Sequence, residues 1–330
     1  TMRTVDLFCG CGGMSLGFQN AGYDVLAAFD NWDRAIEVYK HNFSHDVYKK
    51  DLSDEECTVQ LIKKYNPRII IGGPPCQDFS SAGKRNEDNG RGDLTINFAN
   101  IVAACNPEFF VMENVARIRN TRKLAIARSI LQNAGYGLTE CVLDASLCGV
   151  PQSRKRFFLI GRVGESHDFL LPFIKNGLSR KHLTLRDFFG DEINFEYYYR
   201  HPRSYARRGI FSIDEPSPTI RGVNRPMPKG YPGHPGDPVK DLSEIRELST
   251  ELRSRIQTFP VSFNFIGNKT EKEQMIGNAV PVNLARFVGE IIKKYLAYME
   301  RDNFVPFEKK IYHYDDVQPL MLFDESGRYC

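Results

Sequence analysis

The chain has 330 residues, of which 42% are hydrophobic and 26% charged, and its formal net charge is +3. This length and composition are ordinary for a soluble globular protein and allow one large domain plus a smaller one. No apolar run is long enough to span a membrane and no signal peptide opens the chain, so we expect a cytoplasmic protein.

The eight cysteines form no C-x-x-C pair, and most of them lie in apolar, strand-like stretches. That distribution is typical of reduced thiols and argues against both a disulfide framework and a zinc site, so we expect no metal. The small net charge neither requires nor excludes a nucleic-acid partner, which has to be judged from local clusters of charge.

The pattern of residues 4–8 predicts a first strand, which runs into the glycine turn CGCGG at 9–13 and then a helix over 14–21. Strand, glycine turn and helix together form a nucleotide-type site, because bare backbone and a helix N-terminus both approach the ligand there. The spacing is not G-x-G-x-x-G, so the dinucleotide fingerprint is absent.

A second strand over 24–29 ends at Asp30, about 20 residues after the glycine turn. An acidic residue at this place can accept hydrogen bonds from ribose hydroxyls. It can equally be the N-cap of the helix that we expect over 32–42. Both interpretations stay open from position alone.

A short strand over 47–49 and a helix over 54–65 precede the apolar run of residues 68–71, which reads as a buried strand. GGPPCQ follows at 72–77, and its two prolines stiffen the backbone just before Cys76. A cysteine at the carboxyl end of a parallel strand lies where open α/β sheets bind their ligands. The polar segment 78–92 is long for a compact α/β unit, which favours a functional loop.

Helices over 94–105 and 123–134 alternate with strands over 108–112, 138–144 and 157–161. This alternation predicts a doubly wound, mostly parallel sheet. Glu113, Arg154 and Arg156 flank strand ends, as Cys76 does. A thiolate at Cys76 would need nearby cations, which the two arginines could supply, and a buried carboxyl at Glu113 could donate a hydrogen bond. Taken singly, however, a cysteine is usually a small core residue and a glutamate at a strand end is often a salt-bridge partner.

The middle of the chain is different, because prolines and glycines are dense from 179 to 237. Between 200 and 229 seven arginines and lysines face two acids, a local charge of +5, with tyrosines nearby. That mixture suggests a nucleic-acid surface, although a solvated loop domain without a ligand would look similar. Regular structure returns at 242–259, and a helix is expected over 282–298.

Six motifs in this order resemble the DNA (cytosine-5) methyltransferases of bacterial restriction–modification systems. They are DLFCGCGGMSLGF at 6–18, GPPCQDFS at 73–80, ENV at 113–115, QSRKR at 152–156, RELSTELRSRIQTFP at 246–260 and QMIGNAVP at 274–281. The resemblance implies a Rossmann-like, S-adenosylmethionine-dependent methyltransferase in the bacterial cytoplasm, associated with the chromosome. Residues 1–180 and 262–330 would form its catalytic domain, and 181–261 its target-recognition domain.

The resemblance implies that Cys76 adds to carbon 6 of a cytosine flipped out of duplex DNA, so that carbon 5 can take the methyl group. Glu113 would hydrogen-bond the ring, while Arg154 and Arg156 orient the base, and the 78–92 loop would close over it. S-adenosylhomocysteine would be the product. The protein would act as a monomer on DNA, with a restriction endonuclease as a functional but not physical partner.

The resemblance also carries over ligand contacts. Those to the cofactor are Phe8, Cys9, Gly10, Cys11, Gly13, Asp30, Asn31, Asp51, Leu52, Pro75, Leu94, Asn278 and Val280. Those to DNA are Gln77, Ser80, Arg91, Gln152, Thr219, Arg221, Asn224 and Arg225; arginine reads guanine and asparagine reads adenine in the major groove, though either can bind phosphate. Many relatives have glutamate in place of Asp30, and an aromatic directly after it, whereas Trp32 comes two residues later.

Three other functions would share some of these features. A tRNA cytosine-5 methyltransferase would share Cys76 and Glu113, but the long recognition insert favours a DNA-modifying enzyme. A catalytically silent DNA-binding relative is disfavoured because all four residues proposed for catalysis are present. A Rossmann oxidoreductase lacks its dinucleotide spacing here.

Overall fold

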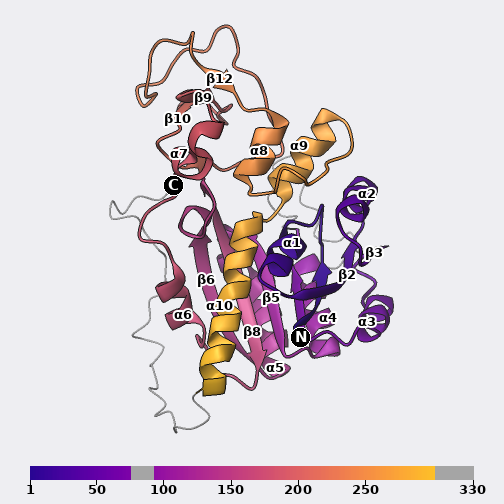
Figure 1. The fold of residues 1–330 in the computed structure, drawn as a ribbon. Helices are drawn as coiled ribbons and strands as arrows, with labels where there is room; N and C mark the ends of the chain where they lie inside the picture. The colour runs from indigo at the N-terminus through magenta and orange to yellow at the C-terminus, as the bar shows by residue number, and fades with distance from the viewer. Residues whose placement is uncertain (76–92, 302–330) are drawn as a thin grey trace.

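The computed structural model describes residues 1–75 and 93–301, and Figure 1 shows its central seven-stranded sheet. The strand order is β3-β2-β1-β4-β5-β8-β6, and all strands except β8 run parallel to one another. This confirms the predicted doubly wound, mostly parallel sheet. The strands are β1 (Arg3–Leu7), β2 (Asp24–Asp30), β3 (Asp46–Lys49), β4 (Ile69–Gly72), β5 (Phe109–Val115), β6 (Tyr136–Asp144) and β8 (Lys155–Val163).

Strand β8 runs antiparallel to both of its neighbours, β5 and β6. Only residues 145–154 connect β6 to β8, and they hold the single turn η3 (Ala145–Leu147) and the short strand β7 (Gln152–Ser153). A parallel crossover needs a longer connection, usually with a helix, so this short one forces β8 to turn back.

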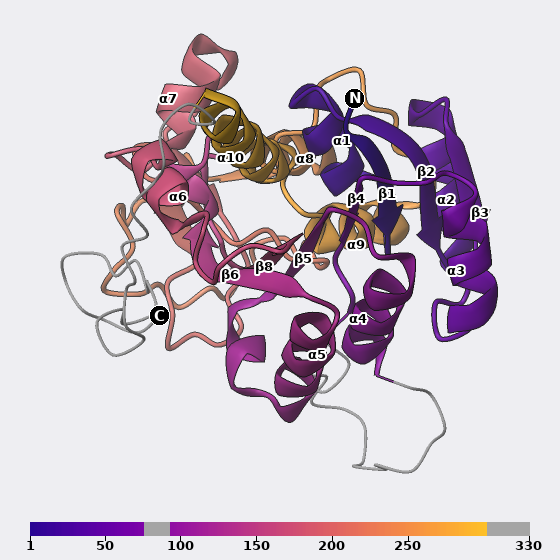
Figure 2. The same ribbon diagram turned by 90° about the horizontal axis from the view of Figure 1, so that it is seen from below.

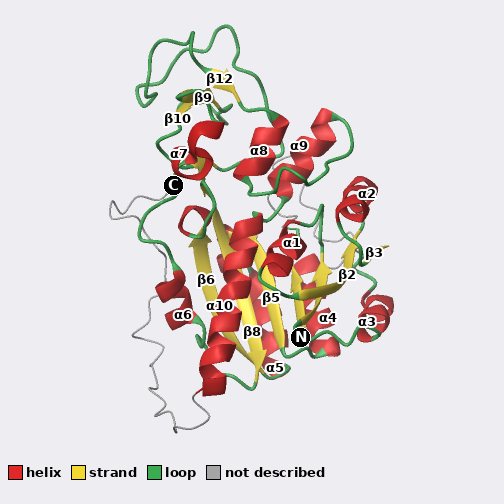
Figure 3. Cartoon of the chain, viewed as in Figure 1, coloured by secondary structure: helices red, strands yellow, loops and turns green. Residues whose placement is uncertain are grey.

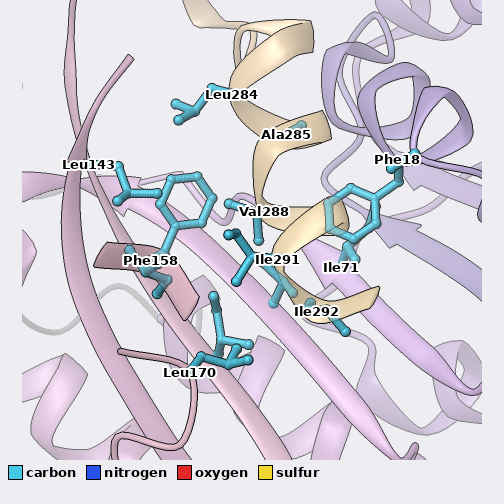
Figure 4. Packing of buried hydrophobic residues seen from close by; sticks show 14 of the residues in the cluster. Phe18, Ile71, Leu143, Phe158, Leu170, Leu284, Ala285, Val288, Ile291 and Ile292 are labelled. Atoms are coloured by element: carbon cyan, nitrogen blue, oxygen red, sulfur yellow. The ribbon is translucent and has the colours of Figure 1, made fainter. Parts of the chain in front are cut away.

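Helices cover both faces of the sheet (Figure 2). One face carries α1 (Gly13–Asn20), α6 (Leu171–Gly177) and α10 (Val282–Arg301), and the other carries α4 (Leu94–Cys105) and α5 (Arg122–Asn133). Side chains of β4 alternate between the two faces, as they must in a strand. Ile69 and Ile71 join the core beneath α1 and α10, shown in Figure 4, whereas Ile70 joins the core beneath α4 and α5.

Between residues 178 and 249 the chain is mostly loop (Figure 3). A second core holds it together and joins Leu185, Tyr198, Ile220 and Ile256 to Ile276. Its elements are α7 (Leu185–Phe189), η4 (Gly190–Glu192), β9 (Tyr197–Tyr199), β10 (Ile210–Ser212), β11 (Ser217–Pro218), β12 (Arg246–Glu247), α8 (Thr250–Ile256) and α9 (Lys269–Asn278).

The sequence-based elements differ from this arrangement in three places. Regular structure was expected from 242 but starts with β12 at Arg246, and α8 has only seven residues. The helix α9, which has a capping box of Asn268 and Glu271, was not expected, and neither were the short helices α6 and α7.

The remaining elements lie at the β3 edge and after β5. At the β3 edge lie α2 (Asp33–Asn42) and α3 (Glu55–Lys63), and η2 (Ala116–Asn120) follows β5. Within the described ranges no helix is long and apolar enough to cross a membrane.

Candidate active site

Glu113 lies where β4 and β5 end side by side at the carboxyl edge of the sheet. Gly72 and Met112 are paired in register, so Glu113 comes level with Gly73. A methyl group placed on Gly73 would lie 3.0 Å from Oε2 of Glu113. Cys76 follows Gly73 by three residues in the sequence but lies outside the described residues. The Glu113 carboxyl therefore lies beside the chain that leads to the predicted nucleophile.

Arg156 reaches Glu113 diagonally across the β5–β8 pair. Val115 is opposite Arg156 and Glu113 is opposite Phe158, so the two charged residues are diagonal neighbours. Nε of Arg156 lies 3.3 Å from Oε1 of Glu113, and the two side chains are only 16% and 12% exposed. The structure thus brings together two of the four residues predicted to be catalytic.

Two opposing effects set the protonation of Glu113. Burial raises the pKa of its carboxyl, whereas the charges of Arg156 and Arg154 lower it in part. The net shift is upward, because desolvation of the charged form outweighs the attraction to the arginines. A raised pKa favours the neutral form of the carboxyl group, and that form can donate a hydrogen bond to a ligand.

Arg154 lies inside the protein, where it joins separate parts of the chain. Its side chain is 2% exposed and donates to three backbone carbonyls, those of Ile220 (2.8 Å), Gly277 (2.8 Å) and Ala279 (3.2 Å). Burial, and then repulsion from Arg156, lower its pKa well below the usual range. Its Nε has no hydrogen-bond partner among the described residues, and its charge acts on Glu113, so the role of Arg154 in orienting the substrate base stays a prediction.

Asn114 is a residue of the site that the sequence analysis did not single out. It is 4% exposed, and its Nδ2 donates to the carbonyl of Pro74 at 2.9 Å. Its Oδ1 accepts from the backbone N–H of Val115 at 2.8 Å. Asn114 thereby fixes the segment between β4 and Cys76. The available signal was its position next to Glu113 in the ENV motif.

The glycine turn after β1 has an unusual backbone and open space above it. Phe8, Gly10 and Gly12 have φ values of 59°, 55° and 105°, in the left-handed region that favours glycine. A methyl group on Gly10 would meet no atom within 4 Å, whereas one on Gly13 would lie 2.3 Å from the carbonyl oxygen of Val280. The turn therefore packs tightly against residues 279–280 on one side and is free to receive a ligand on the other.

Asp30 ties this turn to the start of α2. Its Oδ2 accepts from the N–H of Gly10 at 2.8 Å, and its Oδ1 accepts from the N–H groups of Asn31 and Trp32, both at 2.9 Å. The alternative that Asp30 is the N-cap of α2 is wrong, because the N-cap of that helix is Trp32 and no side chain caps it. A carboxylate has about four acceptor positions, so ribose hydroxyls could share the same oxygens.

Asp6 lies on β1 beneath the turn and is fully buried. Its Oδ2 accepts from the hydroxyl of Ser15 at 2.5 Å, and that hydroxyl accepts from Tyr39 at 2.7 Å. Among the described residues Oδ1 of Asp6 has no hydrogen-bond partner. Burial, together with the charge of Asp30, raises the pKa of Asp6 to about 7, although the bond from Ser15 lowers it in part. No motif in the sequence indicates this unpartnered acceptor.

The other predicted cofactor contacts vary in accessibility. Cys9, Cys11 and Leu52 are buried at 6%, 2% and 2% exposure, so a ligand would meet mainly their backbone. Burial raises the pKa of Cys11 to about 12, which keeps its thiol neutral. Trp32 is half-buried and packs against the cluster around Phe259 and Met275. Asn31, Asp51, Pro75 and Asn278 are exposed, and Phe8, Leu94 and Val280 are half-buried.

Of the predicted DNA contacts, Gln77, Ser80 and Arg91 lie outside the described residues. Gln152 is fully buried, donates to Oε1 of Gln257 at 2.6 Å and accepts from the N–H of Ile220 at 2.9 Å. It therefore links parts of the protein, and the prediction that it contacts DNA does not fit its position. The hydroxyl of Thr219 donates to the carbonyl of Ser153 at 2.9 Å.

The predicted base-reading residues divide into two groups. Arg221 donates to the carbonyl of His201, and Asn224 donates from Nδ2 to the carbonyl of Leu248 at 3.0 Å and to Oε1 of Glu273 at 3.1 Å. Reading adenine requires an amide hydrogen of asparagine, and both of those on Asn224 are used. Arg225, in contrast, is exposed.

The parallel sheet, the glycine turn and the buried acid at one carboxyl edge are those of the Rossmann-like methyltransferases. The family described as C-5 cytosine-specific DNA methylase matches residues 2–294. The Type II methyltransferase M.HindV of Haemophilus influenzae is 59% identical over 292 residues, which cover 88% of this chain and 96% of that protein. M.HgiDI of Herpetosiphon aurantiacus is 55% identical over 295 residues, or 89% and 95% of the two chains.

The chain therefore belongs to the C-5 cytosine-specific DNA methylase family. Among solved structures, the S. pombe Dnmt2 methyltransferase superimposes with a TM-score of 0.64 at 20% identity, covering 90% of this chain and 99% of that one. At this identity the likeness shows the shared fold.

Proposed function

We propose that the protein transfers a methyl group from S-adenosylmethionine to carbon 5 of a cytosine flipped out of a specific short duplex site. The observation that carries this proposal is the buried Glu113, paired with Arg156, beside the segment that leads to Cys76. An acid whose neutral form is favoured by burial is suited to hydrogen-bond ring nitrogen 3 of a cytosine. The target atom is out of reach inside a duplex, so the base has to be flipped out.

The glycine turn fits the cofactor. Open space over Gly10 gives room for a ligand to approach the backbone, and the unpartnered Oδ1 of Asp6 beneath the turn is an acceptor suited to an ammonium group. Asp30 would share its oxygens with the ribose, and Phe8 and Val280 would line the site. S-adenosylmethionine supplies an electrophilic methyl group when it is bound, and S-adenosylhomocysteine is left.

The residues of the chain activate the base. The thiolate of Cys76 adds to carbon 6 of cytosine, and electron density moves to carbon 5. The hydrogen bond from Glu113 to ring nitrogen 3 stabilises the charge that develops on the ring, and Arg156 holds Glu113 in place. After carbon 5 has been methylated, loss of its proton restores the ring and expels Cys76 as thiolate.

The relatives named above are Type II methyltransferases, which supports a role in protecting bacterial DNA from a restriction endonuclease. The endonuclease would be a functional partner without stable contact, and the methyltransferase would act as a monomer in the cytoplasm, on the chromosome. Bisulfite sequencing of plasmid DNA from cells that express the protein would reveal the methylated cytosine and its sequence context together.

A duplex with 5-fluorocytosine at that position tests the covalent step. Fluorine cannot leave as a proton does, so the wild type should form a stable adduct with this DNA and cofactor, while Cys76→Ala should bind DNA without forming one. No adduct with the wild type would sink the proposed mechanism. Methylation of tRNA but not of DNA in parallel reactions would instead favour the tRNA enzyme.

A further inference from the structure

Residues 219–225, which we name the recognition segment, are fastened to the catalytic half of the protein. The carbonyl of Ile220 accepts from Arg154 and its N–H donates to Gln152, at 2.8 and 2.9 Å. Arg253 donates to the carbonyl of Arg221. A methyl group on Gly277 would lie 2.2 Å from the nitrogen of Gly222, so the two backbones are in direct contact. The backbone of the segment is therefore held rigidly.

These attachments use most of the side chains in the segment. Ile220 is fully buried, while Arg221 and Asn224 donate to internal carbonyl and carboxylate groups. Thr219 donates to Ser153. Two side chains remain directed to solvent: Val223, which is 56% exposed, and Arg225.

The charges around Arg225 favour an anionic partner. Burial lowers the pKa of His201, and the positive charges of three arginines lower it further. These are Arg225, Arg221 and Arg200, which therefore all lie near His201. Burial, and then repulsion from Arg221 and Arg253, lowers the pKa of Arg200 to about 9. Among the residues that the structure describes, Arg225 has neither an ion-pair nor a hydrogen-bond partner.

We propose that Arg225 is the specificity-determining residue of this segment and reads a guanine in the target site, with Val223 against the neighbouring pyrimidine. A guanidinium on a rigid backbone can donate two parallel hydrogen bonds to O6 and N7 of guanine, and exposed valine methyls suit the 5-methyl edge of thymine. Arg221 and Asn224 position the segment and do not read bases. This inference rests on the proposed function, because it requires a duplex DNA substrate.

The test compares methylation of a duplex library with randomised bases around the target cytosine. Wild type is compared with Arg225→Lys, which keeps the charge but loses the fork, and with Arg225→Ala. A bidentate pair discriminates by about 1–3 kcal/mol, or roughly 5- to 150-fold. Both variants should lose the preference for guanine at one position by such a factor, while methylation of other sequences falls less. Val223→Ala should relax the preference at the adjacent position.

Arg207→Ala is the matched control, since Arg207 is an exposed arginine of the same basic surface outside the segment. Arg207→Ala should weaken methylation to the same extent for all sequences. It should also reduce the slope of log binding constant against log salt concentration by about one, as expected when one phosphate contact is lost. The same uniform pattern for Arg225→Ala, with the guanine preference intact, would overturn the inference. A wild type that methylates no member of the library would instead refute the proposed function.

Discussion

At Glu113, burial and two arginines pull the protonation equilibrium in opposite directions, and burial prevails. The position explains the balance: the carboxyl is inside the carboxyl edge of the sheet, yet diagonal to Arg156 on an antiparallel neighbour. A parallel β8 would put its first residues at the far end of the sheet. The reversed direction of one strand thus supplies the cation that accompanies the acid.

Glu113→Gln should lower single-turnover methylation by about 10²- to 10⁴-fold, which is typical for loss of a positioned proton donor. DNA affinity should change only a few-fold, because the side chain is buried and keeps its size. The matched control is Glu108→Gln, just before the opposite end of β5, where Glu108 pairs with Arg68 and Arg162. It should leave the rate unchanged; an equal loss in both variants would argue for a structural role of Glu113.

Asp6 should make the stability depend on pH in an unusual direction. Folded Asp6 keeps its proton to about pH 7, whereas an unfolded aspartate loses it near pH 4. The folded state binds more protons in this window, so the free energy of unfolding contributed by Asp6 falls as the pH rises from about 4 to about 7.

Asp6→Asn should remove this fall, worth about 1–4 kcal/mol at about 1.4 kcal/mol per pKa unit. Urea unfolding at pH 5 and pH 8 measures it, with the exposed Asp191→Asn as control. From pH 5 to pH 8, the free energy of unfolding should fall less in Asp6→Asn than in the wild type and the control. Identical differences in all three proteins would contradict the burial argument.

Sequence motifs indicated that Glu113 lies at this sheet edge, but not the internal contacts of Arg154 and Gln152. Residue types and their order indicate which groups meet at one sheet edge, because parallel strands all end there. They do not indicate that Arg154 points between the recognition segment and residues 277–279. That direction depends on β7 pairing with β11, in which Gln152 pairs with Ser217, 65 positions later in the sequence.

At the scale of elements, helix α1 packs closely against α10. A methyl group on Gly17 would lie 2.4 Å from the carbonyl oxygen of Val282 and 2.5 Å from Cβ of Ala285. The glycine therefore lets two helices from opposite ends of the chain pack at short range over the sheet. This contact holds the start of α10, and with it Val280, against the glycine turn.

Gly17→Ala should lower the free energy of unfolding by about 1–3 kcal/mol through overpacking, despite the better helix propensity of alanine. Gly230→Ala is the control, because a methyl group there meets no atom within 4 Å. Thermal unfolding of both variants measures the effect. A Gly17→Ala protein as stable as the wild type would show that the helices can separate without cost.

Long periodic elements such as α10 and the β1–β5 strands were predictable, whereas α9 and the direction of β8 were not. Helix α9 has almost no apolar stripe, since it buries Glu273, Met275, Ile276 and Gly277 against different partners. Its capping box was the available signal. Strand β8 required counting the connection from β6, which is too short for a crossover.

At the scale of the whole molecule, a buried ion pair joins α8 to α9. Nε of Arg253 lies 2.6 Å from Oε2 of Glu273, and the side chains are 2% and 3% exposed. Glu273 also accepts from Thr250 at 2.7 Å and from Asn224. The recognition segment and the end of the catalytic half are therefore stabilised by one shared network.

Arg253→Met should cost about 3–5 kcal/mol, because it leaves the Glu273 charge buried without its cation. Adding Glu273→Gln should restore most of that loss, since glutamine still accepts from Thr250 and Asn224. The exposed pair Arg286–Glu290 is the control, and Arg286→Met should cost at most about 1 kcal/mol. Denaturant unfolding decides: no recovery in the double variant would mean that Arg253 acts through packing alone.

The contact between Gly222 and Gly277 has a consequence for exchanging target specificity between relatives. A chimaera with the recognition domain of a relative also carries that relative's counterpart of residues 219–222. This foreign segment must still bind to Arg154, Gln152 and Gly277 of the host. Crossovers placed after Gly222 and before β12 leave that joint native. We expect such hybrids to keep the methylation rate of the host, while crossovers at 181 and 261 lower it, as parallel assays on each parent's site would reveal.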